Sequence, residues 1–342
     1  MLTENNKGST HAYDLTETLT GTEEIDSPTL VFIHGWLLSR AYWQPVTAQL
    51  SADYRCLSYD LRGFGESAVL DQPKHHDAQL SEGSNSQISI PSGKVLSAEA
   101  SSENVVNNGT ASVKTDCTDQ TVSYRMETYQ PSRYSLAAYA RDLETLLNDL
   151  NINNVWVIGH SLGGSIALWA AYLQPERVQG VICINAGGGI YIPKEFEKFR
   201  AAGQQMVKFR PRWLPTFPLL PRLFSRIMVN KPLSPRWGKQ RLKDFVNAEA
   251  VAAVGALLET TTQSEVHLLP QIVSLLTQPV HFITATEDSI MPPRYVRHLA
   301  SFHPQFKEQE TVSELSNCGH MAMVEQPEAV AKIVRDVVNI DG

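Results

Sequence analysis

The sequence has little that would mark a secreted, membrane-spanning or metal-binding protein. Its 342 residues include only four cysteines, and no two of them have CxxC spacing, which argues against a disulfide framework and a structural zinc site. No apolar run approaches the roughly 18 residues that a transmembrane helix needs. The segment from Met1 to Gly8 lacks the apolar core of a signal peptide, so we expect a cytoplasmic protein.

Charge is scarce and unevenly distributed. Charged residues make up 19% of the chain, and the net charge is −7. Between Ile190 and Phe245, thirteen Lys and Arg residues stand against three Asp and Glu, so this segment carries +10 and the remainder −17. Aromatic residues, Trp213 and Phe217 among them, lie between these cations. The pattern suits peripheral contact with an anionic membrane and, equally, a solvated helical cap.

Nucleic acid is not an expected partner, because the whole protein is acidic and no recognition motif accompanies the basic segment. The sequence leaves the oligomeric state open.

Apolar runs alternate with helix-length patterns over most of the chain. This alternation predicts an α/β protein with a mostly parallel central sheet and helices on both faces. The predicted strands are Leu15–Leu19, Thr29–Ile33, Arg55–Tyr59, Val155–Ile158, Val181–Ile184 and Val280–Ala285. The predicted helices include Ala41–Leu50, Ser135–Leu150 and Glu328–Val338.

Two segments interrupt the alternation. Residues 71–132 are rich in Ser, Asn, Gln, Asp and Thr, and we expect a largely disordered surface insertion with a short strand at Val122–Met126. Residues 187–276 have a helical, proline-broken pattern between two sheet strands, which predicts a cap. The expected organisation is therefore a core in two parts, 1–186 and 277–342, separated by a basic and aromatic helical cap.

The pentapeptide Gly159-His160-Ser161-Leu162-Gly163 lies between an apolar strand pattern and a segment of small residues. That context predicts a sharp strand-to-helix turn that exposes the Ser161 hydroxyl at the edge of the sheet. Glycines on both sides fit such a turn, because it demands unusual backbone angles and leaves no room for a neighbouring Cβ.

A serine hydroxyl needs a base to become a nucleophile at neutral pH, and the base needs a group that fixes its tautomer. Asp288 follows the strand that ends at Ala285, and His320 lies in a loop bordered by glycine. The chain order of serine, acid and histidine is that of one known arrangement of this triad. We prefer Asp288 as the acid, and its neighbour Glu287 remains an alternative.

Two backbone amides are expected to stabilise a developing oxyanion. Leu162, directly after the predicted nucleophile, supplies one of them, and Trp36, after the strand that ends at Ile33, supplies the other. Asp60 and Arg62 follow the next strand, and we expect them to form a structural ion pair.

These blocks together resemble the α/β-hydrolase fold superfamily, in the large group of serine hydrolases with a helical cap. The matching segments are Val31–Trp36, Tyr59–Ser67, Gly159–Gly164, Glu287–Pro292, Cys318–Met321 and Glu325–Pro327. The resemblance covers nearly all of residues 12–340 apart from the insertion. It implies a triad of Ser161, Asp288 and His320, oxyanion donors at Trp36 and Leu162, and neither a metal nor an organic cofactor.

The expected activity is cleavage of a carboxylic ester or thioester of a hydrophobic substrate through an acyl-enzyme. Esterases, lipases, lactonases, C–C bond hydrolases and cofactor-free perhydrolases share these motifs, so lactone or C–C hydrolysis and perhydrolysis remain alternatives. A ligand-binding receptor or scaffold that retains the triad is the alternative from another class.

Overall fold

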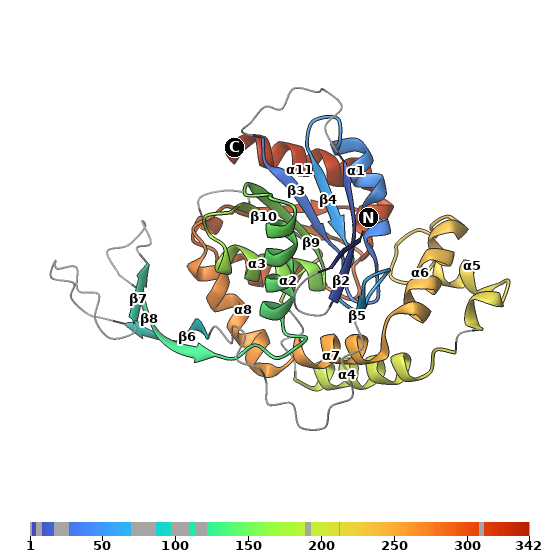
Figure 1. Cartoon of the computed structure of the whole chain (residues 1–342), viewed down its shortest axis with the longest axis horizontal. Coiled ribbons are helices and arrows are strands. Elements are labelled where there is room, and N and C mark those ends of the chain that lie inside the picture. Colours follow the sequence, from blue (N-terminus) through green and yellow to red (C-terminus); the bar gives the residue numbers. More distant parts are fainter. Residues whose placement is uncertain are drawn as a thin grey trace.

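The computed structural model describes residues 2–4, 9–16, 27–69, 87–96, 110–113, 122–188, 193–211, 213–307 and 311–341. At its centre is a nine-stranded sheet in the order β1-β2-β4-β3-β9-β10-β11-β12, with β5 paired to β2 (Figure 1). The strands are β1 (Leu2–Glu4), β2 (Ser9–Thr16), β3 (Thr29–Ile33), β4 (Cys56–Tyr59), β5 (Ala68–Val69), β9 (Val155–His160), β10 (Val178–Ile184), β11 (Val280–Ala285) and β12 (Val312–Leu315). From β4 to β12 every neighbouring pair is parallel, whereas β1, β2 and β5 pair antiparallel. The predicted mostly parallel sheet is thereby confirmed.

The central parallel strands β3 and β9 are buried along their whole length, and β3 is apolar from Leu30 to Ile33. In β3, Val31 and Ile33 join one hydrophobic cluster, while Leu30 and Phe32 join the other. Successive side chains of a strand point to opposite faces, so one run of apolar residues supplies two cores.

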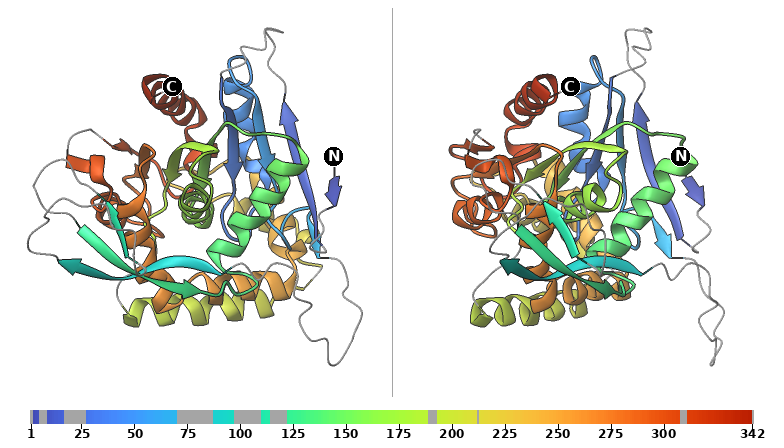
Figure 2. Two further views of the ribbon diagram at one scale, coloured as in Figure 1. Left: turned by 60° about the vertical axis from the view of Figure 1, so that its left-hand side comes forward. Right: turned by 90° about the vertical axis from the view of Figure 1, so that its left-hand side faces the viewer.

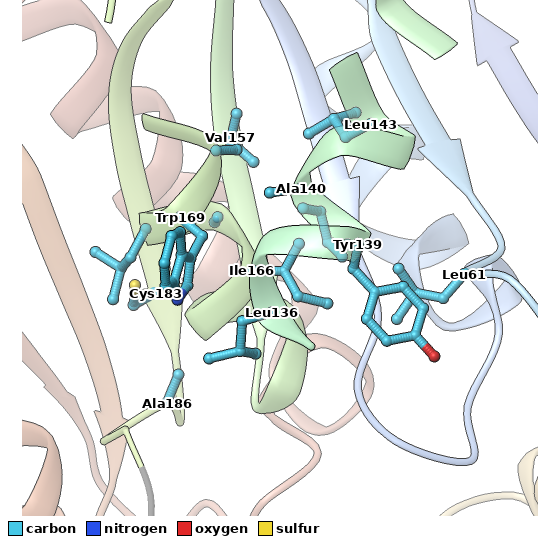
Figure 3. Packing of buried hydrophobic residues seen from close by; sticks show 14 of the residues in the cluster. Leu61, Leu136, Tyr139, Ala140, Leu143, Val157, Ile166, Trp169, Cys183 and Ala186 are labelled. Carbon is cyan, nitrogen blue, oxygen red and sulfur yellow. The ribbon is translucent and has the colours of Figure 1, made fainter. Parts of the chain in front are cut away.

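Helices cover both faces, as the alternation predicts. The first cluster contains residues of α2 (Leu136–Asp149), α3 (Leu162–Leu173), α8 (Gln263–Leu275) and α9 (Pro293–Ala300). The second contains residues of the short helix η1 (Arg40–Trp43), α1 (Gln44–Leu50), α10 (Ala322–Glu325) and α11 (Pro327–Asp341). Figure 3 shows Ile166 of α3 beside Leu136 of α2, with Trp169 of α3 and Leu143 of α2 in the same cluster.

Several predicted element boundaries agree with the structure. Thr29–Ile33 and Val280–Ala285 are confirmed as strands. The predicted helix from Ser135 is also confirmed, with Ser135 as its cap, because the Ser135 hydroxyl accepts a hydrogen bond from the amide of Ala138. The strand predicted at Leu15–Leu19 is wrong in its position: β2 begins at Ser9 and ends at Thr16, and residues 17–19 lie outside the described part.

The expectation of a largely disordered insertion over 71–132 is wrong for the residues of it that the structure describes. β6 (Ile88–Leu96), β7 (Thr110–Val113) and β8 (Val122–Tyr129) form a three-stranded antiparallel sheet, and β8 includes the strand predicted at Val122–Met126. This sheet extends from the body of the molecule (Figure 2). The Tyr172 hydroxyl of α3 donates to the Ser89 carbonyl at 2.6 Å.

The helices between β10 and β11 include α4 (Pro193–Lys208), α5 (Leu220–Phe224), α6 (Pro235–Asn247) and α7 (Ala250–Glu259), with the short helix η2 (Leu214–Thr216) between α4 and α5. Figure 1 shows α4 and α7 below the sheet, and α5 and α6 to its right. α8, the last helix within the cap predicted over 187–276, packs against α3 of the core. We therefore use the word cap for α4–α7 and the segments between them. In the described part of the chain, every helix is too short or too polar to cross a bilayer.

Candidate active site

Ser161 occupies a strained turn between β9 and α3. Its backbone has φ of 54° and ψ of −118°, a region that residues with a Cβ rarely adopt. A Cβ on Gly159 would lie 2.1 Å from the carbonyl oxygen of Gly163, and a Cβ on Gly163 would lie 2.3 Å from that of Ile33. Close approach of backbones therefore requires both flanking glycines, which is the reason that the sequence pattern is informative here.

His320 and Asp288 form a buried pair. The His320 Nδ1 atom lies 2.7 Å from Asp288 Oδ2, and the side chains are 2% and 0% exposed. Asp288 Oδ1 accepts from the amides of Ile290 and Met291, both at 2.8 Å. An ionised carboxylate only accepts hydrogen bonds, so the imidazole proton belongs on Nδ1 and Nε2 keeps its lone pair. Glu287, the alternative acid, is exposed.

The backbone of His320 is held by two core side chains. Its carbonyl oxygen lies 2.7 Å from His160 Nε2 and accepts from Asn185 Nδ2 at 2.9 Å. Burial lowers the pKa of His160 well below its usual value, and the neighbouring His320 lowers it further. A neutral His160 that donates through Nε2 therefore supports the His320 loop.

A cavity of about 110 Å³ lies at Ser161, between the core and the cap. Ser161, Leu162 and Trp36 line it, so the structure brings three of the five predicted residues to one cavity. Its other lining residues include Leu136 and Ser165 from the core, Phe199, Ala256 and Leu257 from the cap, Thr260 just after α7, and Ile290 and Met291 after β11. Met291 also donates its amide to Asp288, which connects the cavity to the His320–Asp288 pair.

The two predicted oxyanion donors lie next to Ser161. Leu162 is the first residue of α3, so its amide has no acceptor within the helix. A Cβ on Gly35 would lie 3.2 Å from Ser161 Cβ, which places the backbone just before Trp36 against the serine. The indole of Trp36 donates to the Ala253 carbonyl of α7 at 2.9 Å and so ties this loop to the cap.

His34 holds the same loop from its other side, a role that sequence reasoning missed. Its Nδ1 lies 2.8 Å from the Gly35 carbonyl oxygen, and its Nε2 accepts from the Leu61 amide at 3.0 Å. Burial lowers the pKa of His34, so the ring is neutral and can make both contacts. The only feature of the sequence that indicated this role of His34 was its position directly before Gly35.

The predicted ion pair of Asp60 with Arg62 is wrong. Asp60 pairs with Arg40, and Arg62 reaches Asp142 of α2 at 2.9 Å. The reason lies in the turn after β4: the Asp60 carboxylate accepts from the amides of Arg40 and Glu66, both at 2.7 Å, and faces inward. Arg62 leaves the turn in the other direction.

Cys318 is fully buried, and burial raises the pKa of its thiol to about 12. It therefore stays protonated at neutral pH and is a poor nucleophile. Among the described residues, no group of three or more His, Cys, Asp or Glu side chains is arranged to hold a metal ion.

The chain matches the family model of the alpha/beta hydrolase fold over residues 28–327. It is 24% identical over 285 residues to a pimeloyl-[acyl-carrier protein] methyl ester esterase of Pseudoalteromonas atlantica, covering 81% of this chain and 83% of that protein. An uncharacterized protein of Mycobacterium tuberculosis is 30% identical over 180 residues, 49% of this chain, and the match spans about half, 51%, of that relative.

Among solved structures, an esterase from Thermogutta terrifontis superposes with a TM-score of 0.63 at 20% identity, covering 99% of this chain and 97% of that one. A membrane phospholipase A superposes with a TM-score of 0.65 at 16% identity, covering 100% of this chain and 86% of that one. At these identities the superpositions establish the fold.

Proposed function

Because the chain belongs to the alpha/beta hydrolase fold family, we propose that it is a serine hydrolase that cleaves a carboxylic ester or thioester of a hydrophobic substrate. The observation that carries this proposal is the strained Ser161 at the cavity, combined with a buried His320 whose Nδ1 is bound by Asp288. The esterase among its relatives supports the same reaction class.

In the proposed reaction, His320 Nε2 takes the proton of the Ser161 hydroxyl as the oxygen attacks the ester carbonyl. The amides of Leu162 and Trp36 stabilise the oxyanion of the tetrahedral intermediate. The C–O bond to the alcohol breaks, and the leaving alkoxide receives the proton from His320. Water repeats these steps on the acyl-enzyme, which returns Ser161 and releases the carboxylic acid.

The cavity favours an apolar acyl or alkyl group, because Leu136, Leu162, Phe199 and Leu257 line it. We expect kcat/KM for p-nitrophenyl esters to rise about fourfold per added methylene until the cavity is full, at about 0.8 kcal/mol per buried CH₂. In Leu257→Phe the highest kcat/KM should occur at a shorter acyl chain, because the phenylalanine ring is larger than the leucine side chain and fills part of the cavity.

Initial rates over acetate, propionate, butyrate, hexanoate and octanoate esters measure this preference. Val251→Phe is the matched control, since Val251 lies on the same helix and is 69% exposed. An unchanged optimum in Leu257→Phe would place the acyl group elsewhere. Ester binding without turnover, detected as a rise in Tm, would favour the receptor alternative.

The cap also carries seven exposed apolar side chains between residues 206 and 227, which we call the cap patch. Its members are Met206, Phe209, Trp213, Phe217, Leu219, Leu223 and Ile227, with exposed fractions from 39% to 72%. Clusters of exposed apolar side chains mark interaction sites.

The sequence from Lys198 to Lys243 contains twelve Lys and Arg residues and no Asp or Glu. Aromatic side chains beside cations suit an anionic lipid surface, and on this observation we propose peripheral docking there. The cytoplasmic location stays a prediction.

Binding to vesicles tests the docking proposal. The wild type should float with vesicles of phosphatidylserine and phosphatidylcholine, and binding should fall by about tenfold when ionic strength is raised from about 0.05 to about 0.5 M. The triple variant of Phe209→Ser, Trp213→Ser and Leu219→Ser should lose binding. Phe302→Ser, which removes an exposed phenylalanine outside the patch, should not. Equal flotation with neutral vesicles, or equal binding of the triple variant, would refute this proposal.

A further inference from the structure

A segment of the cap, Ile227–Asn230, lies directly against the loop that carries His320. The His320 amide donates to the Met228 carbonyl oxygen at 2.9 Å. A Cβ on Gly319 would lie 2.7 Å from both the Asn230 nitrogen and Val229 Cα. The residue before His320 is therefore glycine because the backbone of the cap passes there.

Glu325 joins the two segments. Its Oε1 accepts from the amide of Gly319 at 3.0 Å and from that of Met321 at 3.3 Å, on either side of His320. Its Oε2 accepts from the Asn230 amide at 2.8 Å. One carboxylate thus spans the histidine loop and the cap segment, and charge strengthens each of these hydrogen bonds.

Arg241 of α6 holds the cap segment from its other side. It is 8% exposed, and its guanidinium donates to the Ile227 carbonyl and lies 3.1 Å from Met228 Sδ. Met228 has φ of +61°, a strained value for a residue with a Cβ. Such a conformation persists only where surrounding contacts hold it, and Arg241 supplies two of them.

The attachments of His320 therefore come from different parts of the molecule. Asp288 holds its ring, Asn185 and His160 hold its carbonyl oxygen, and the cap holds its amide. We infer that Glu325 and Arg241 are positioning residues for His320, acting through the cap segment Ile227–Asn230. This inference rests on the proposed function, and it means that the cap sets the rate of the chemical step as well as access to the cavity.

Glu325→Gln is designed to remove the hydrogen bond from the Asn230 amide and to keep the one from the Gly319 amide. The amide oxygen of the substituted side chain can still accept from Gly319, whereas its NH₂ group cannot accept from Asn230. We expect kcat to fall about tenfold with KM changed less than about twofold, because the geometry of proton transfer is altered and the cavity is not. Glu328→Gln, at an exposed position of α11, is the matched control and should leave kcat unchanged.

Arg241→Met tests the other link, with Lys239→Met, at an exposed position of the same helix, as its control. We expect kcat to fall again with KM nearly constant, and Arg241→Lys to recover part of the loss. The double variant Glu325→Gln/Arg241→Met should lose less than the product of the two single losses, because both act through one segment. Amide exchange of the peptide around His320 should rise in both single variants.

These experiments separate the two proposals. A wild-type protein without ester turnover and without labelling of Ser161 would reject the proposed function. An active wild type whose kcat is unaffected in Glu325→Gln and Arg241→Met would reject the positioning role alone. Effects on KM only, or fully multiplicative losses, would also reject it. Should Glu325→Gln fail to fold, Arg241→Met and Arg241→Lys decide the question.

Discussion

Replacing Ser161 with alanine is expected to lower kcat for ester hydrolysis by a factor of about 10⁴ to 10⁶. The variant lacks the oxygen that forms the acyl-enzyme, so only the oxyanion donors and substrate positioning remain. KM should stay within about threefold, because one lost oxygen leaves the apolar lining of the cavity intact. Steady-state kinetics with the best p-nitrophenyl ester measures both constants.

Ser165→Ala is the matched control for this experiment. Ser165 lies one turn further along α3 and lines the same cavity, yet it is not placed in the proposed reaction. Its kcat should remain within about threefold of the wild type. Equal losses in the two variants would mean that the cavity needs a hydroxyl for binding and not Ser161 as a nucleophile.

Asp288→Asn should cost about 10⁴ in kcat with little change in the fold. Asp288 Oδ1 is held by two backbone amides, so the oxygen of asparagine is expected to remain there and its NH₂ group to face His320 Nδ1. A donor at that place forces the imidazole proton onto Nε2. His320 could then no longer take the proton of Ser161.

Glu287→Gln is the control for the acid and decides between the two candidates that the sequence left open. Because Glu287 is exposed, its amide variant should keep nearly full activity. If Glu287→Gln lost activity and Asp288→Asn kept it, the acid would have been assigned to the wrong residue. The rates of both variants are measured at several pH values. A variant that has lost the acid is slow at every pH, whereas a variant with a shifted pH dependence regains activity at another pH.

The sheet, and the position of each candidate triad residue just after a parallel strand, were predictable because each depends on local pattern and on strand order. Ser161 follows β9, Asp288 follows β11 and His320 follows β12, and the carboxyl ends of parallel strands gather at one edge. A buried parallel strand also has an apolar run that is easily recognised. The roles of these residues stay predictions until activity is measured.

What the sequence did not reveal depends on contacts between distant segments. The Asp60–Arg62 pair looked plausible from spacing, yet Arg40 reaches Asp60 from the short helix η1. Composition alone favoured disorder around β6–β8, because backbone hydrogen bonds between strands leave little compositional signal in a polar segment. The contact of Met228 with His320 joins residues 92 positions apart (320 − 228), and no periodicity indicates it.

The most direct measurement is the site at which an active-site phosphonate reagent becomes attached. The purified protein is treated with a fluorophosphonate, and its intact mass and its peptides are measured by mass spectrometry. Our account predicts one adduct per chain, on the peptide that contains Ser161, and none in Ser161→Ala. A protein that hydrolyses esters while its adduct lies on another residue, or that is labelled equally well without Ser161, would contradict the central claim.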